Sequence, residues 1–183
     1  SQRMAETGDF IDIRYQDEPR YLQPAGIYWL QSLSTLALDS PGHDSVWSYR
    51  VPSLMAALGA VLLTALFAAR FFGAPVGFAA GLLLAACLSL NFEARIAKTD
   101  AALLASIATA QFALMRMYLV PNAKRWLAAL FWAALGIGLL IKGPIILIVV
   151  GATVAALVVW DSLSLRKDGS FVAFEVGFDT LEV

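Results

Sequence analysis

Between Val51 and Trp160 the chain is almost continuous hydrocarbon, and short polar breaks divide this stretch into five apolar blocks. Each block has roughly the 17 to 25 residues that an α-helix needs to cross a bilayer. Because lipid offers no water to satisfy backbone groups, the blocks must be helices, and polar chemistry is confined to their ends. The breaks contain Arg70, the cluster from Glu93 to Asp100, Arg116, Lys124 with Arg125, and Lys142.

The composition indicates the same class of protein. Hydrophobic residues make up 60% of the 183 residues and charged residues 15%, a balance that is unsuited to a soluble domain of this size. The net charge of −1 gives no indication of nucleic acid, and we expect no nucleic-acid partner. The single cysteine, Cys87, lies within an apolar block, so the sequence offers neither a disulfide framework nor a cysteine-based metal site.

We therefore predict an all-α integral membrane protein with about five transmembrane helices, preceded by an extracytoplasmic loop with interfacial amphipathic helices. The loop covers residues 1–50 and the helical bundle residues 51–160, with spans at about 51–70, 71–92, 100–118, 125–141 and 143–160. Residues 161–183 form a cytoplasmic tail of uncertain structure. Within this tail, two alternating runs, Leu163 to Arg166 and Phe171 to Phe178, hint at a hairpin.

Charge and small residues suggest how the spans are arranged. Lys and Arg are denser near the span ends on the side that carries Arg70 and Arg116, so the positive-inside rule places that side in the cytoplasm. The loop, the segment from Glu93 to Asp100 and Lys142 then share the opposite rim. Gly77 and Gly81 form a Gly-xxx-Gly pair, which we expect to serve close helix packing.

Within the loop, bulky apolar side chains follow Pro24 at a spacing that forms one broad helical face. This face comprises Ile27, Trp29, Leu30, Leu33, Leu36 and Leu38, with Gln31, Ser32 and Ser34 facing away. The pattern predicts a helix lying in the plane of the membrane interface, in contact with membrane lipids.

Three groups of residues resemble landmarks of one group of membrane enzymes. The first comprises Arg3 to Phe10, Asp17 to Pro24 and Ile27 to Leu30; the others run from Ala94 to Leu104 and from Leu140 to Pro144. In this order they are similar to the first extracytoplasmic loop and two later landmarks of the bacterial protein-mannosyltransferase-like and lipid A aminoarabinose-transferase families. The resemblance covers positions 1 to about 160.

The resemblance implies a GT-C membrane glycosyltransferase of the bacterial inner membrane. Such an enzyme transfers a sugar from a polyprenyl-phosphate donor to a protein or lipid acceptor on the periplasmic side. The families place an Asp-Glu pair, which includes the catalytic base, just before the segment that begins here at Ser1. We therefore expect a fragment that is truncated at both ends and inactive alone. The alternative is a multi-span transporter or structural membrane subunit without catalysis, although the polar residues lie at the rims of the spans.

Four candidate site residues lie at the ends of the spans. Asp100 is the candidate catalytic residue, because an ionised side chain at the mouth of a span is costly unless used or paired; the alternative is a helix cap. Arg95 and Lys98 could bind the donor phosphate, or pair with neighbouring acids or lipid headgroups. Lys142 could reach the same phosphate, or be a snorkelling lysine in a turn.

In the loop, Arg20, Tyr21 and Gln23 are candidate substrate-binding residues. Aminoarabinose-type relatives have an aromatic residue followed by Glu-Lys-Pro in this stretch, where the Glu binds a metal and the Lys binds the lipid phosphate. Here Leu22 and Gln23 occupy the Glu and Lys positions. We therefore assign no metal and no certain cofactor, and transfer of aminoarabinose itself is disfavoured.

Overall fold

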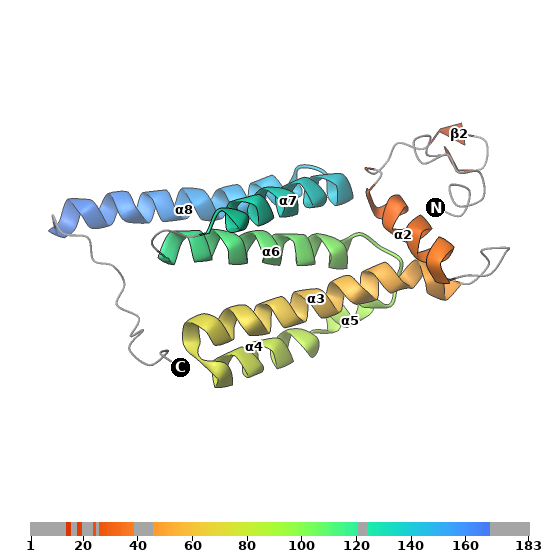
Figure 1. Cartoon of the computed structure of the whole chain (residues 1–183), viewed down its shortest axis with the longest axis horizontal. Coiled ribbons are helices and arrows are strands. Elements are labelled where there is room, and N and C mark those ends of the chain that lie inside the picture. The colour runs from red at the N-terminus through yellow and green to blue at the C-terminus, as the bar shows by residue number, and fades with distance from the viewer. Residues whose placement is uncertain are drawn as a thin grey trace. The chain divides into compact units, whose positions relative to one another are not determined.

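The computed structural model describes residues 14–15, 18–19, 24, 26–38, 46–120 and 124–168. Two two-residue strands, β1 (Arg14–Tyr15) and β2 (Glu18–Pro19), pair antiparallel, and the rest of the regular structure in these ranges is helical. The helices are α2 (Gly26–Leu38), α3 (Val46–Phe72), α4 (Ala74–Ala85), α5 (Leu88–Ala94), α6 (Asp100–Leu119), α7 (Arg125–Lys142) and α8 (Ile145–Asp168) (Figure 1).

Within the described ranges, four helices are long and apolar enough to cross a membrane: α3, α6, α7 and residues Ile145–Leu163 of α8. Helices α4 and α5 pass the same test together but are bent by 63° relative to one another, as in a broken span or a re-entrant loop; counted as one span, they bring the number to five. The fold is therefore an all-α integral membrane fold, as the apolar blocks predict.

Helices α3 and α4 form an antiparallel hairpin that is held by very small side chains (Figure 1). Gly73 makes the turn with a φ of 93°, a conformation that costs glycine little because it has no Cβ. Gly77 and Gly81 then face α3: a Cβ on Gly77 would lie 2.6 Å from the Ala65 carbonyl oxygen, and one on Gly81 would lie 2.8 Å from the Ala65 Cβ. The predicted packing role of the Gly-xxx-Gly pair is confirmed.

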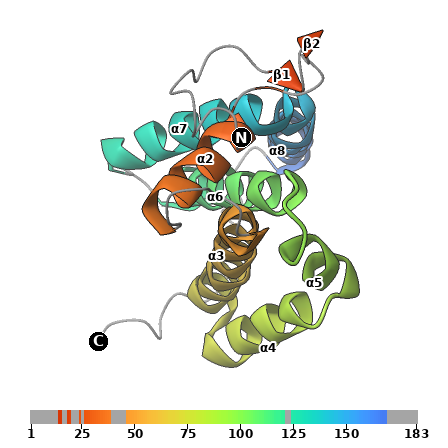
Figure 2. The ribbon, with the colours of Figure 1, turned by 90° about the vertical axis from the view of Figure 1, so that its right-hand side faces the viewer.

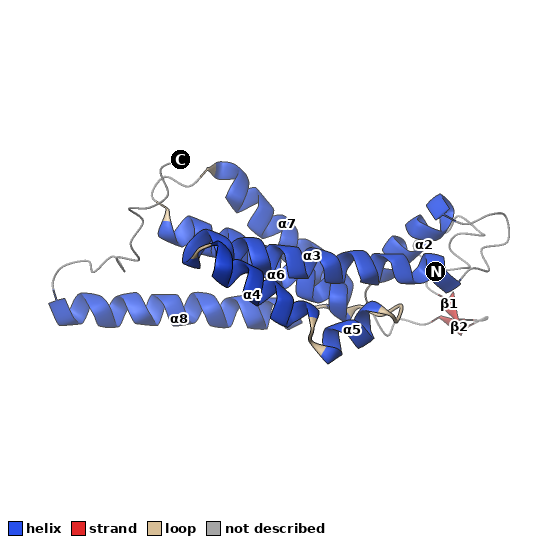
Figure 3. Cartoon of the chain, turned by 90° about the horizontal axis from the view of Figure 1, so that it is seen from below, coloured by secondary structure: helices blue, strands red, loops and turns tan. Residues whose placement is uncertain are grey.

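The bend between α4 and α5 is stabilised by one amide side chain. The Asn91 Nδ2 group donates to the carbonyl oxygens of Ala85 at 2.6 Å and Cys87 at 3.1 Å. A broken helix leaves carbonyls without their usual partners, which is costly in lipid. The Asn91 side chain supplies a donor to the Ala85 carbonyl and a second donor to the Cys87 carbonyl, which also accepts from the Asn91 amide. Figure 3 shows α5 turned away from the axis of α4 at this point.

Helix α6 packs against both α3 and α7, so it lies at the centre of its part of the bundle. Its contact surface is again made of small residues, with Ala110 and Ala113 fully buried. Because α6 begins at Asp100 and its antiparallel neighbour α7 ends at Lys142, two polar termini meet at one end. Helix α2 crosses this end and contacts α3 and α7 (Figure 2).

Helix α2 presents its polar face to the protein and its apolar face outward. Gln31, Ser32 and Thr35 are buried. Trp29, Leu30, Leu33, Leu36 and Leu38 are exposed. As predicted, the polar side chains lie on the face opposite the apolar ones. This polar face packs against the helical bundle. Ile27 differs from the prediction, because it is buried rather than part of the exposed apolar face.

The chain divides into two compact units, Ser1–Leu147 and Ile148–Val183. Helix α8 begins three residues before the second unit and continues without interruption to Asp168. Leu163 to Arg166 is therefore helical, and the first strand of the predicted hairpin is wrong, because helix propagates from a long apolar segment at little cost per added residue. Phe171 to Phe178 lies outside the described residues.

Candidate functional site

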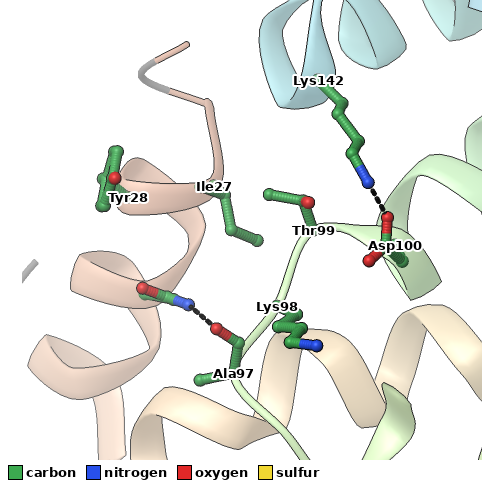
Figure 4. A pocket seen from close by; sticks show the side chains of 8 residues that line it. Ile27, Tyr28, Ala97, Lys98, Thr99, Asp100 and Lys142 are labelled. Carbon is green, nitrogen blue, oxygen red and sulfur yellow. Dashed lines mark hydrogen bonds and ion pairs between the residues drawn. The ribbon is translucent and has the colours of Figure 1, made fainter. Parts of the chain in front are cut away.

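A pocket of about 370 Å³ lies where α6 begins and α7 ends (Figure 4). Three parts of the chain that are distant in sequence form its walls: α2, the connection between α5 and α6, and the last residue of α7. The lining residues are Ile27, Tyr28, Gln31, Ala97, Lys98, Thr99, Asp100 and Lys142. The predicted convergence of the Glu93–Asp100 segment, Lys142 and the leading loop is confirmed for these residues.

Asp100 and Lys142 form an ion pair across the pocket (Figure 4). Asp100 is the first residue of α6 and Lys142 the last of α7, so each charge also has the sign that its helix terminus favours. The N-cap position of α6 belongs to Thr99, so the capping interpretation of Asp100 is wrong. Both side chains keep about a third of their surface exposed, which leaves the pair accessible to a ligand.

Lys98 is held less tightly than Lys142. Its Nζ lies 3.4 Å from Glu93 Oε1 and 5.9 Å from the centre of the Phe92 ring, and half of the side chain is exposed. Exposed ion pairs at such distances contribute little free energy. The Lys98 ammonium group is therefore available to another anion at a small cost in free energy. In the structure its partner is Glu93, which agrees with the alternative that Lys98 pairs with a neighbouring acid.

The backbone that carries Lys98 and Asp100 is held by two side chains from other helices. Gln31 Nε2 on α2 donates to the Ala97 carbonyl at 3.2 Å, and Ser53 Oγ on α3 donates to the Lys98 carbonyl at 2.9 Å. Sequence reasoning missed Ser53, Tyr28 and Thr99. A signal for Ser53 existed, because it is the third residue of the apolar block that starts at Val51, and a serine there needs a partner for its hydroxyl.

The remaining candidates fall outside the pocket or outside the described residues. Arg95 is the exposed C-cap residue of α5 and does not line the pocket. Arg20, Tyr21, Leu22 and Gln23 lie outside the described ranges, so their proposed contacts with substrate stay predictions. Among the residues that the structure does describe, no three His, Cys, Asp or Glu side chains are grouped closely enough to hold a metal ion.

Residues 22–178 match the protein family described as dolichyl-phosphate-mannose-protein mannosyltransferase. The match spans all the helices described above, from α2 to α8. The chain belongs to this family. This mannosyltransferase-family assignment agrees with the resemblance carried by the three groups of residues in the sequence.

Two solved structures share the fold of the mannosyltransferase-family chain. ArnT from Cupriavidus metallidurans in the apo state superposes with a TM-score of 0.77 at 23% identity, over 92% of this chain and 30% of that one. The same protein bound to undecaprenyl phosphate gives a TM-score of 0.78 at 23% identity, over 90% and 31%. The chain thus spans about 30% of the length of ArnT. None of the curated proteins matches the chain.

Proposed function

We propose that the chain binds the phosphate of a polyprenyl-phosphate sugar donor and belongs to a membrane glycosyltransferase that passes the sugar to a protein or lipid acceptor. The observation that carries this proposal is the pocket beside α2 that Lys98, Asp100 and Lys142 all line. Each lysine is paired with one carboxylate, Lys98 with Glu93 and Lys142 with Asp100, so a phosphate would bind by replacing these carboxylates as the partner of the two ammonium groups.

The two lysines have the chemistry that the donor requires. When the bond between the sugar and the phosphate breaks, its electrons go to the phosphate oxygen, so negative charge grows on the leaving group. Ammonium groups already placed around that oxygen stabilise the developing charge. Lys98 gives up a 3.4 Å contact with Glu93 to do so, and Lys142 exchanges the Asp100 carboxylate for the phosphate.

Asp100 is the carboxylate that lines the pocket in the described part of the chain, and we propose it as the candidate catalytic residue. Once Lys142 turns to the phosphate, the Asp100 carboxylate is free to accept the proton of an acceptor hydroxyl. The acceptor oxygen then bonds to the sugar carbon as the phosphate leaves.

Beside the pocket, α2 provides an apolar surface for the isoprenoid chain. Trp29, Leu33 and Leu36 are exposed on the outer face of the helix whose inner face lines the pocket. A lipid phosphate needs both a polar site for its headgroup and an apolar path for its tail. This arrangement supports a donor that enters from the bilayer, with the pocket at the periplasmic face of the bacterial inner membrane.

The comparisons support the same substrate class. The family description names dolichyl-phosphate mannose, and one of the two similar structures is ArnT bound to undecaprenyl phosphate. Both compounds contain a polyprenyl phosphate, so two separate comparisons support the proposed donor class.

One feature favours a transporter, because the span formed by α4 and α5 is broken, as spans that line transport sites often are. The carbonyls at this break are bonded by Asn91 of the same chain, and no residue of the break lines the pocket. The polar groups that converge lie instead at the ends of α6 and α7. A phosphate-binding enzyme therefore fits the described residues better than a conduit does.

The proposal is tested by titrating undecaprenyl phosphate onto the purified chain in lipid nanodiscs. We expect Lys98→Gln and Lys142→Gln each to weaken binding about tenfold or more, because each removes a charge-assisted contact with phosphate. Lys124→Gln is the matched control, since this exposed lysine precedes the opposite end of α7. Binding that is unchanged in both pocket variants, or that falls equally in the control, would contradict the proposal.

A further inference from the structure

We propose that Gln31 and Ser53 are positioning residues, which hold the backbone segment that carries Lys98 and Asp100 in the geometry that the site requires. The importance of this segment for ligand binding rests on the function proposed above. The holding itself is a property of the fold and can be measured without a ligand.

Two helices hold the segment at consecutive peptide groups. Ser53 on α3 is fully buried and donates to the Lys98 carbonyl, while Gln31 on α2 is 7% exposed and donates to the Ala97 carbonyl. Figure 4 shows the bond that Ala97 accepts at the wall of the pocket. The two donors belong to different helices, and the two carbonyls that they bind are adjacent in the chain. Together these bonds fix both the position and the direction of the segment.

The segment needs such a restraint because it is not part of a regular helix. Between the end of α5 and Thr99, its local bonds run from the Ile96 amide to the Glu93 carbonyl at 3.3 Å and from the Lys98 amide to the Ile96 carbonyl at 2.8 Å. The carbonyls of Ala97 and Lys98 point out of this turn toward α2 and α3. Backbone carbonyls in an apolar environment are costly unless bonded, so the two donors select one conformation of the segment.

The restraint acts on Lys98 and Asp100 through their main chain. The Lys98 side chain makes a weak ion pair and is half exposed, so the fold fixes its point of attachment more firmly than its ammonium group. Asp100 follows two residues later as the first residue of α6. Moving the segment by even one ångström would displace both charged groups relative to Lys142 on α7.

Two other buried hydroxyl groups in the described part of the chain make a different kind of contact. Ser106 Oγ donates to the Ala102 carbonyl at 3.0 Å, and Thr35 Oγ1 donates to the Ser32 carbonyl at 2.8 Å, each within its own helix. Ser53 and Gln31 instead reach residues that are 45 and 66 positions away in the sequence. Ser106 and Thr35 are therefore matched controls for the loss of a buried hydrogen bond that joins no separate elements.

The first experiment measures amide hydrogen–deuterium exchange of the chain in nanodiscs. We expect Ser53→Ala and Gln31→Leu to speed exchange at Ile96 and Lys98 about tenfold, because the turn opens more often once a carbonyl loses its donor. Ser106→Ala and Thr35→Val should leave these two amides unchanged. Unchanged exchange in the test variants, or an equal rise in the controls, would overturn the proposal. Should Ser53→Ala fail to fold, Gln31→Leu on α2 decides the result.

The second experiment titrates the same variants with undecaprenyl phosphate. Ser53→Ala and Gln31→Leu should bind about tenfold more weakly than wild type, and the two controls within about twofold. When Lys98→Gln is already present, adding Ser53→Ala should weaken binding by a further factor of less than about two. The effects of residues that act through one another are not additive. Full additivity, or wild-type affinity in both test variants, would refute positioning of the ligand site.

The two experiments separate this inference from the function on which it rests. If the wild-type chain does not bind undecaprenyl phosphate, the proposed function fails, and the exchange measurement alone decides whether Gln31 and Ser53 hold the segment. If the wild type binds but the test variants bind equally well, the positioning inference fails and the proposed function stands.

Discussion

The α3–α4 hairpin and the end formed by α2, α6 and α7 are stabilised in opposite ways. At the hairpin, Gly77 and Gly81 lie directly against Ala65 and Ala69, and the contact depends on shape alone. At the other end, the buried Ser53 and Gln31 side chains and one ion pair join elements that are distant in sequence. In lipid, apolar association between helices gains little from the hydrophobic effect, so close packing and polar bonds are the two available means. The end that is held by polar bonds also contains the pocket.

The largest expected effect tests the hairpin. Gly77→Ala should lower the free energy of unfolding by about 2 kcal/mol, because its Cβ would lie within 2.6 Å of backbone atoms of α3 and the helices must separate. Gly59→Ala in α3 is the control, since nothing lies within 4 Å of a Cβ there. Denaturation of the chain in mixed micelles checks both. Equal effects at the two positions would show that close contact is not what holds α3 to α4.

The next effect tests the broken span that lies between the two regions. Asn91→Ala should lower the free energy of unfolding by about 1 to 2 kcal/mol, because the Ala85 carbonyl loses its side-chain donor while the Cys87 carbonyl keeps only the bond from the residue 91 amide. Thr109→Val removes a comparable bond to the Ala105 carbonyl inside an unbroken helix and should cost less. The same denaturation assay applies. A larger loss for Thr109→Val would place the weak point of the bundle away from the break.

A smaller effect is expected from the ion pair in the pocket. The coupling free energy between Asp100 and Lys142 should be about 1 kcal/mol or less, because both side chains are about one-third exposed and water screens their attraction. A double-mutant cycle with Asp100→Asn and Lys142→Gln, followed by denaturation, measures it. A coupling of several kcal/mol would mean that the pair is structural and is not released to a phosphate.

The smallest effect concerns the outer face of α2. Leu33→Gln changes an exposed apolar side chain on the face opposite Gln31, so it should alter the free energy of unfolding by no more than about 0.5 kcal/mol. Thr35→Val, on the buried face, should cost more because it removes a bond to the Ser32 carbonyl. Denaturation of both variants in one lipid composition compares the faces. The reverse order would mean that α2 is held by its apolar face.

The sequence predicted the all-α membrane fold because each apolar block has the length of the bilayer and lipid permits one local structure, the helix. It also predicted the packing role of Gly77 and Gly81, since a spacing of four residues places both on one helix face. The helix after Pro24 was likewise visible as a periodic pattern. These features depend on residues that are near one another in the chain.

Only the tertiary structure decided what the polar residues contact. Gln31 pairs with Ala97 and Asp100 with Lys142, at separations of 66 and 42 residues, and no local pattern encodes such distances. The bend at Cys87 was hidden for a different reason: the bonds from Asn91 are local, but they reach carbonyls that an unbroken helix would satisfy by itself. Lipid dictates helices from composition alone, whereas hydrogen bonds between helices depend on how those helices pack, and that packing brought the charged ends of α6 and α7 together beneath α2.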